Sequence, residues 1–331
     1  MKRCLATAAL LALSVSVAVA DQLALIDFSK LTRDIQVRQG SNEPDENEAT
    51  VVDYAEFAGS TFPQAELDQM KVSLAIPNWD VLLSTSARTI ENQRLSVTRE
   101  ATVSDAARDH EGEQMAGRMV MGVRVRFPEA QFNAFARIEP PFDIPAFGQD
   151  DEDQFKGFGV IKNVGVIKEV EATLFGGNFP YGFAVVLVDS NGVERQIFMG
   201  NLQFDGWRRM SWSNPNYITD VRHQEISRLP LYPNSSPFVK LGGFIIYRDS
   251  QQVGGDAVTY IRDVKVTYDL ALLESQTTES DIIHEDIWGI VAERQNARTR
   301  AELQRVANTQ VLRFLERQKL DTTTNLDTTT P

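Results

Sequence analysis

Alternation of apolar and polar residues, repeated along the middle of the chain, is the feature that most restricts the fold. Met119 to Phe127 reads MVMGVRVRF, in which Val123, Val125 and Phe127 fall on one side of an extended strand and two arginines on the other. Comparable β-branched or aromatic runs follow at 159–175, 183–188, 193–199, 207–212, 239–248 and 257–270. Asp189-Ser190-Asn191-Gly192 predicts a hairpin between two of them. Seven or eight antiparallel strands of this kind predict an all-β sandwich.

The chain changes character near Glu274, where the strand-like runs stop. We expect the sandwich domain to cover residues 21–273 and a polar linker to cover 274–281. Residues 282–318 contain no proline and one glycine, which favours a helical tail over 282–319. Its apolar residues form two stripes, Ile283, Ile287, Ile290 and Val291, then Leu303, Val306, Ala307, Val311, Phe314 and Leu315. Residues 320–331 predict a disordered C-terminus. The tail could dock on its own sandwich or reach a neighbouring subunit.

The first twenty residues have the pattern of a cleaved secretory signal peptide. Lys2 and Arg3 precede an apolar stretch, and Ala18-Val19-Ala20 predicts cleavage between Ala20 and Asp21. The apolar stretch is too short to cross a bilayer, which takes about 20 residues. Cys4 precedes it, whereas a lipoprotein cysteine would follow it, so we predict no stable membrane anchor. The mature chain would be exported and would contain no cysteine.

Acidic residues dominate the charge of the chain. The net charge is −13, and removal of Lys2 and Arg3 leaves 31 basic against 46 acidic residues, a net charge of −15. Binding to phosphate backbones requires a surplus of lysine and arginine. We therefore predict no nucleic-acid partner.

The sequence predicts no metal site, no cofactor and no catalytic residues. His110, His223 and His284 are far apart, and His284-Glu285 is not completed to an H-E-x-x-H motif. The acidic segments near 40–49 and 149–154 carry the ligands that calcium prefers, without EF-hand spacing, so solvated acidic loops are the favoured interpretation. A pair of carboxylates brought together in space, as in a glycoside hydrolase, stays open.

Four residues are candidates for contact with a partner protein or a glycan: Trp207, Arg208, Arg209 and Trp212. Tryptophan and arginine are enriched in binding hot spots. Because the two tryptophans are five positions apart, one uninterrupted strand would place them on opposite faces, so at most one would lie in the core. The alternative is that Trp207 is core and that both arginines are solvated.

Several long segments resemble the FlaA family, the flagellar filament outer layer proteins of spirochaetes. They are WDVLLSTSARTIENQR (79–94), VMGVRVRFP (120–128), GVIKNVGVIKEV (159–170), NLQFDGWRRMSWSNPNYITDVR (201–222), LPLYPNSSPFVKLGGFIIYRD (229–249) and TYIRDVKVTYD (259–269). The segments occur in order between about 25 and 270. One departure is Lys162, where the family pattern has histidine.

The resemblance implies a structural subunit and no enzyme. Members of this family sheathe the FlaB flagellin core of the periplasmic flagellum and affect filament stiffness, shape and motility. The resemblance also implies a jelly-roll, galactose-binding-like sandwich in the periplasm. Its expected partners are the flagellin core and other sheath subunits, with a glycan on flagellin as a further one. Two other interpretations are a periplasmic carbohydrate-binding jelly-roll protein and a jelly-roll glycoside hydrolase.

Overall fold

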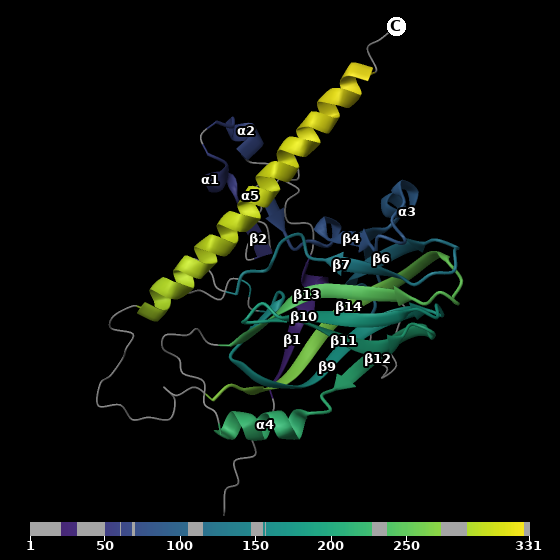
Figure 1. Ribbon diagram of the computed structural model, residues 1–331, viewed down its shortest axis with the longest axis vertical. Coiled ribbons are helices and arrows are strands. Elements are labelled where there is room, and N and C mark those ends of the chain that lie inside the picture. Colours follow the sequence, from purple (N-terminus) through teal and green to yellow (C-terminus); the bar gives the residue numbers. More distant parts are fainter. Residues whose placement is uncertain are drawn as a thin grey trace, which may run out of the picture.

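Two six-stranded antiparallel sheets pack face to face as a β-sandwich in the computed structural model, which confirms the predicted fold class (Figure 1). The structure describes residues 21–31, 50–59, 61–67, 70–104, 115–146, 155, 157–226, 237–272 and 290–327. The predicted signal peptide, the acidic segments 40–49 and 149–154 and the linker 274–281 lie outside these residues.

The first sheet, here the β14 sheet, is organised around its longest strand. Its order is β12 (Asp205–Ser213), β9 (Val164–Gly177), β14 (Gly255–Leu270), β6 (Met119–Phe127) and β5 (Val97–Thr102). Along its second edge, β14 pairs first with β6 and then with β1 (Asp21–Asp27). The strand predicted over 119–127 has these bounds, with Val123 and Val125 buried as expected.

The second sheet, here the β13 sheet, has the same plan. Its order is β11 (Glu194–Asn201), β10 (Gly182–Asp189), β13 (Phe238–Arg248), β7 (Ala134–Glu139) and β4 (Asp80–Leu83), and β8 (Val160–Lys162) extends it beside β13. The predicted hairpin joins β10 to β11. The Asp189 carboxylate closes its turn by accepting from the backbone N–H groups of Asn191 and Val193, at 2.8 and 2.9 Å.

A β-bulge changes which residues of β14 face the core. Tyr260 and Val264 would share a face in a regular strand, but the register shifts between Ile261 and Asp263. Val264 therefore packs in the core between the sheets, whereas Tyr260 lies on the outer face. Arg262 at the bulge is buried and pairs with Asp263, Nε to Oδ2, at 2.8 Å.

Short elements surround the sandwich. The strands β2 (Val51–Asp53) and β3 (Lys71–Ser73) form a separate pair. The helices are η1 (Phe28–Lys30), α1 (Ala55–Ala58), α2 (Gln64–Leu67), η3 (Ile76–Asn78), α3 (Ile90–Leu95) and α4 (Tyr217–Ile226). The fourteen described strands exceed the seven or eight expected, because β2, β3, β4, β5, β7 and β8 have only three to six residues each and such short runs carry little recognisable alternation.

The C-terminal helix α5 (Ile290–Asp327) crosses one end of the sandwich beside α1, α2 and β2 (Figure 1). Its second predicted stripe faces inward: Val306 is buried in the main core and Ala307 packs with Tyr54 and Met70. The tail thus docks on its own sandwich, the first of the two expected possibilities. Residues 282–289 lie outside the described residues. The helix continues to Asp327, beyond the expected end at 319, because each added helical residue gains a backbone hydrogen bond once the helix exists.

Among the described residues, no helix combines the length and apolarity needed to cross a membrane.

Candidate functional site

The four predicted contact residues all lie on β12, at one edge of the β14 sheet, but they do not form one surface. Trp212 packs against the main core, on the side of the strand that faces the second sheet. Trp207 packs on the outer face, against a separate cluster that contains Val103 and Met115. The two rings lie on opposite faces, as their spacing predicts.

Trp207 and Arg208 each pack against aromatic rings, on opposite sides of β12. Trp207 belongs to a row of aromatic rings across three strands, with Phe175 between it and Tyr260 and both centroid distances at 5.6 Å. The Arg208 guanidinium lies 5.3 Å from the centre of the Phe204 ring, on the other side of β12. Alternation along β12 places Arg209 on the same side as Trp207. Trp207 is therefore supported by packing and is only partly available to a partner.

The histidines do not meet in the described structure. His223 lies on α4, and His110 and His284 fall outside the described residues. No three His, Cys, Asp or Glu side chains gather as a possible metal site in the part of the chain that the structure describes.

A groove of about 780 Å³ lies between α5 and the end of the β13 sheet. Its floor comes from β7, β13 and the β10–β11 hairpin, and its wall comes from residues 301–313 of α5. Charged side chains of both signs line it: Arg137, Glu139, Asp143, Asp189, Glu194, Lys240, Glu302, Arg305 and Arg313.

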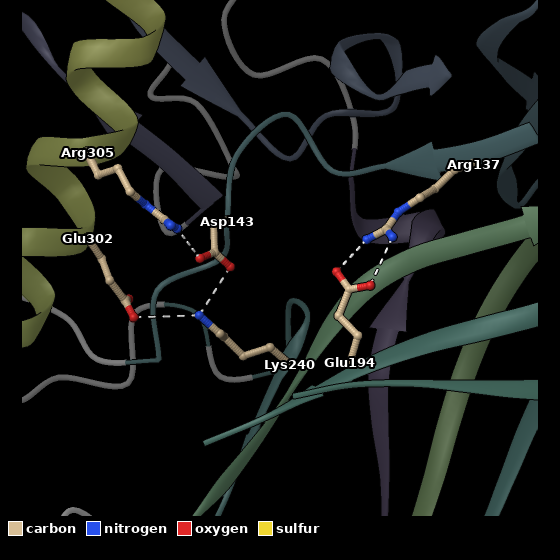
Figure 2. Close-up of polar contacts among 6 residues, drawn as sticks. All are labelled: Arg137, Asp143, Glu194, Lys240, Glu302 and Arg305. Atoms are coloured by element: carbon tan, nitrogen blue, oxygen red, sulfur yellow. Dashed lines mark hydrogen bonds and ion pairs between the residues drawn. The ribbon is translucent and has the colours of Figure 1, made fainter. Parts of the chain in front are cut away.

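Lys240 is the buried centre of an ion-pair network that joins the sandwich to α5 (Figure 2). Its Nζ lies 3.2 Å from Oδ1 of Asp143 and 3.7 Å from Oε1 of Glu302. Arg305 of α5 donates to the other carboxylate oxygen of Asp143. Burial raises the pKa of the Glu302 carboxyl, and the nearby Lys240 charge opposes that change. We call these four residues the α5 clamp.

Arg137 and Glu194 form a second pair at the other side of the groove (Figure 2). The guanidinium donates two hydrogen bonds to the carboxylate, at 2.7 and 2.9 Å, across the sheet from β7 to β11. These bonds hold the pKa of Glu194 below its usual value. Arg137 also lies 2.6 Å from the carboxylate of Glu139.

An apolar shelf adjoins this pair on the outer face of the β13 sheet. Its floor is buried and consists of Ala184, Val186 and Ile245, and Tyr247 packs against it. Its exposed members are Phe198, Phe135 and Leu82, with 55%, 42% and 41% of their surface accessible. We call these seven residues the β13 shelf.

Local contacts fix the positions of the rings of the shelf on the sheet. A Cβ atom on Gly182 would lie 2.8 Å from the Phe198 ring, so the absence of a side chain there lets that ring lie over β10. The Tyr247 hydroxyl donates to Oε1 of Gln196 on β11 at 2.7 Å. Phe135 and Tyr247 are neighbours, with ring centres 6.4 Å apart.

Sequence reasoning missed both the groove and the shelf. The segment Ala134–Glu139, AFARIE, carries the signal for the shelf, because its larger residues alternate with small or apolar ones and therefore share the outer face. The groove carries no local signal, because it requires β7, β13 and the hairpin to meet a helix more than 50 residues further along the chain.

Comparison with solved structures finds sandwich modules of low similarity. One is TmCBM61 in complex with β-1,4-galactotriose, with a TM-score of 0.28, 9% identity, and coverage of 58% of this chain and 88% of that one. Another is the family 11 carbohydrate-binding module of Lic26A-Cel5E from Clostridium thermocellum, with a TM-score of 0.26, 11% identity, and coverage of 60% and 89%.

Similarity to curated proteins is much stronger. The flagellar filament outer layer protein of Spirochaeta aurantia is 43% identical over 324 residues, which are 95% of this chain and 91% of that protein. The protein of the same name from Treponema pallidum is 40% identical over 97% of this chain and 95% of its own length. The profile of the flagellar filament outer layer protein family FlaA matches residues 43–277. The chain therefore belongs to the FlaA family of flagellar filament outer layer proteins.

Proposed function

We propose that this protein is a structural subunit of the outer layer of the periplasmic flagellar filament, where it binds the flagellin core and contributes to filament stiffness, shape and motility. The observation that carries this proposal is similarity over nearly the whole chain to two proteins named flagellar filament outer layer protein. Export through the N-terminal signal peptide belongs to the same proposal.

The β13 shelf is the surface that suits contact with a filament. Three large apolar side chains, Phe198, Phe135 and Leu82, share one sheet face and are each about half exposed. Apolar side chains that gather on one face of a soluble protein mark an interaction surface more often than scattered ones do. In a polymer, many weak contacts of this kind add up to stable attachment.

We propose further that the protein acts without catalysis. A glycoside hydrolase needs two carboxylates on either side of the scissile bond, and Asp143 and Glu302 form one pair of neighbouring carboxylates in the groove. Both lie against the same Lys240 ammonium, at 3.2 and 3.7 Å, and Arg305 also holds Asp143. A scissile bond and a water molecule would need the space that these cations occupy.

Imaging of purified filaments from a wild-type strain and from a strain that lacks this protein tests the proposed function. We expect an extra outer layer on the wild-type filament, with density that fits the sandwich, and a thinner, more easily bent filament in the deletion strain. Identical filaments in the two strains would overturn the proposal.

A complementation arm separates a structural role from a catalytic one. Glu302→Gln alters one of the paired carboxylates, while Phe198→Asp alters the shelf. The proposal expects Glu302→Gln to restore the outer layer and Phe198→Asp to restore less of it. Hydrolysis of neutral oligosaccharides by the wild-type protein, lost in Glu302→Gln, would contradict the non-catalytic role.

A further inference from the structure

We propose that the β13 shelf and the adjoining groove form one binding site for a neutral oligosaccharide. The inference deepens the proposed function, on which it rests, by naming the chemical class that this face of the subunit binds. It concerns residues of the β13 sheet and α5, not the predicted contacts on β12.

The shelf supplies the apolar half of such a site. One face of a sugar ring consists of C–H groups, which pack on flat apolar surfaces such as aromatic rings. Phe198 lies over Gly182 at one side of the shelf and Phe135 lies beside Tyr247 at the other, and both rings are about half exposed. These rings are separated by three strand spacings, about 14 Å, so the shelf can hold more than one sugar unit.

The groove supplies the polar half. Sugar hydroxyls both donate and accept hydrogen bonds, and the paired side chains at the groove offer both kinds of group close together. Arg137 and Glu194 form a doubly hydrogen-bonded pair. The Tyr247 hydroxyl and the Gln196 side-chain amide form another polar pair, on the shelf side.

The two halves are continuous along the strands. Phe135 and Arg137 are two positions apart on β7, and Glu194, Gln196 and Phe198 are alternate residues on β11. Alternate residues of a strand share a face. A chain of sugar units could therefore pass from the shelf into the groove without leaving this face of the sheet.

The charges of the groove favour a neutral ligand over an anionic one. Each of its four cations is already paired with a carboxylate of the same chain: Arg137 with Glu194, Lys240 and Arg305 with Asp143, and Arg313 with Asp80. Five carboxylates line the same groove. A phosphate or an acidic sugar would meet this negative charge and would have to displace an existing ion pair.

Two probe sets test the proposal with the full mature protein. One is an array of free neutral and acidic oligosaccharides, and the other is the oligosaccharide fraction released from purified filaments. We expect binding to neutral members, followed by calorimetric titration with the tightest one. Binding to the released fraction alone would identify a glycan attached to a filament protein, and binding to the array alone would identify a free glycan. Binding to no neutral oligosaccharide in either set, or to acidic ones alone, would overturn the proposal.

Ring substitutions locate the site. Phe198→Ala should weaken binding about tenfold, and Phe198→Tyr should retain it, because the tyrosine keeps the aromatic surface. Trp207→Phe is the matched control on the opposite sheet and should leave affinity unchanged. Circular dichroism and thermal unfolding check that each variant is folded. Loss of binding in Trp207→Phe with full binding in Phe198→Ala would move the site to β12 and overturn the proposal.

Glycan binding and filament association of the wild-type protein, measured side by side, separate this inference from the proposed function. If the wild-type protein binds no neutral glycan but still forms the outer layer of the filament, the glycan site is wrong and the structural role stands. If it binds a neutral glycan but is absent from purified filaments, the site stands and the structural role is wrong.

Discussion

Lys240 of β13 and Glu302 of α5 lie 3.7 Å apart, Nζ to Oε1, and join the sandwich to its C-terminal helix. Only 6% of the Lys240 side chain is exposed, compared with 31% of Glu302. A buried ammonium is tolerated only where anions compensate for lost hydration, and Asp143 is the second of these, at 3.2 Å. The buried charge of Lys240 is therefore compensated by both carboxylates only while α5 is docked with Glu302 against it, so the α5 clamp stabilises the docked position of the helix.

Replacement of Lys240 with methionine should destabilise the protein. The substitution fills a similar volume but leaves the carboxylates of Asp143 and Glu302 close together without their shared cation. We expect the free energy of unfolding to fall by about 1–3 kcal/mol, less than for a fully buried pair because both carboxylates are partly exposed. Urea unfolding measures the change. Arg313→Met is the control, because it removes another ion pair between α5 and the sandwich, and its exposed pair with Asp80 should contribute less than about 0.5 kcal/mol. Equal effects in the two variants would contradict the role of the clamp.

The raised pKa of Glu302 gives stability a specific pH dependence. Because burial raises this pKa above its usual value of 4.5, the folded chain holds the proton more tightly than the unfolded chain. Protonation of Glu302 therefore contributes to the free energy of unfolding fully below pH 4.5, and this contribution is lost as pH rises through the raised pKa. Glu302→Gln cannot titrate, so its stability relative to wild type should improve between pH 4.5 and 7. Urea unfolding across this range measures the difference, and a difference that does not change with pH would contradict the raised pKa of Glu302.

Tyr217 should lose its phenolic proton at a higher pH than an ordinary tyrosine. Its hydroxyl donates to Oδ2 of Asp269 at 2.6 Å, and this hydrogen bond, followed by burial, raises its pKa to about 12. Because the pKa is raised in the folded state, the hydrogen bond from Tyr217 to Asp269 stabilises the fold fully below the usual pKa of 10. This stabilisation is lost as pH rises through about 12. Ultraviolet titration of the tyrosines should therefore show a phase near pH 12 that Tyr217→Phe removes. If Tyr217→Phe instead removed a phase near pH 10, the hydrogen bond to Asp269 would not form in solution.

Local patterns predicted the strands well where the alternation was long and less well elsewhere. The strand at 119–127 and the hairpin around 189–192 followed directly from their residues. The face of Tyr260 could not be predicted, because the bulge beside Arg262 changes the phase in the middle of β14. No residue type in that segment marks a bulge.

The segment from Asp53 to Asp80 carries apolar residues without a regular period, and the structure explains why. Tyr54 and Met70 pack on Ala307, and the Phe62 ring lies 6.4 Å from that of Phe314, so residues 54–70 have α5 as their partner, whereas Ile76 and Trp79 pack in the main core. Apolar residues that pack on a helix more than 200 residues away in the sequence do not follow the regular spacing of a strand or helix. The groove was unpredictable for the same reason, since α5 forms one of its walls.

Gly243 should tolerate alanine poorly. Its φ is +128°, and an added Cβ would lie 2.2 Å from the carbonyl oxygen of Ile138 on the adjacent strand. Backbone strain and this clash should together cost about 3 kcal/mol or more of unfolding free energy. Gly192→Ala separates the two causes, because Gly192 also has a positive φ, +77°, but has open space around it. That control should cost about 1 kcal/mol, and similar losses at the two sites would show that the Ile138 carbonyl moves away.

Ala307 provides the sharpest test of how α5 docks. Its side chain is buried between the helix and the cluster of Tyr54 and Met70, so Ala307→Asp would place an unpaired carboxylate in an apolar contact. We expect a loss of about 2–4 kcal/mol in the docking of α5, seen as faster proteolysis within 290–327. Asn308→Asp adds the same charge one position away on the exposed side and should leave the cleavage rate unchanged. If both variants were cleaved at the wild-type rate, α5 would not rest on this cluster in solution. Faster cleavage in Ala307→Asp alone, with the strand signal of the circular dichroism spectrum retained, would show that the sandwich folds without its helix.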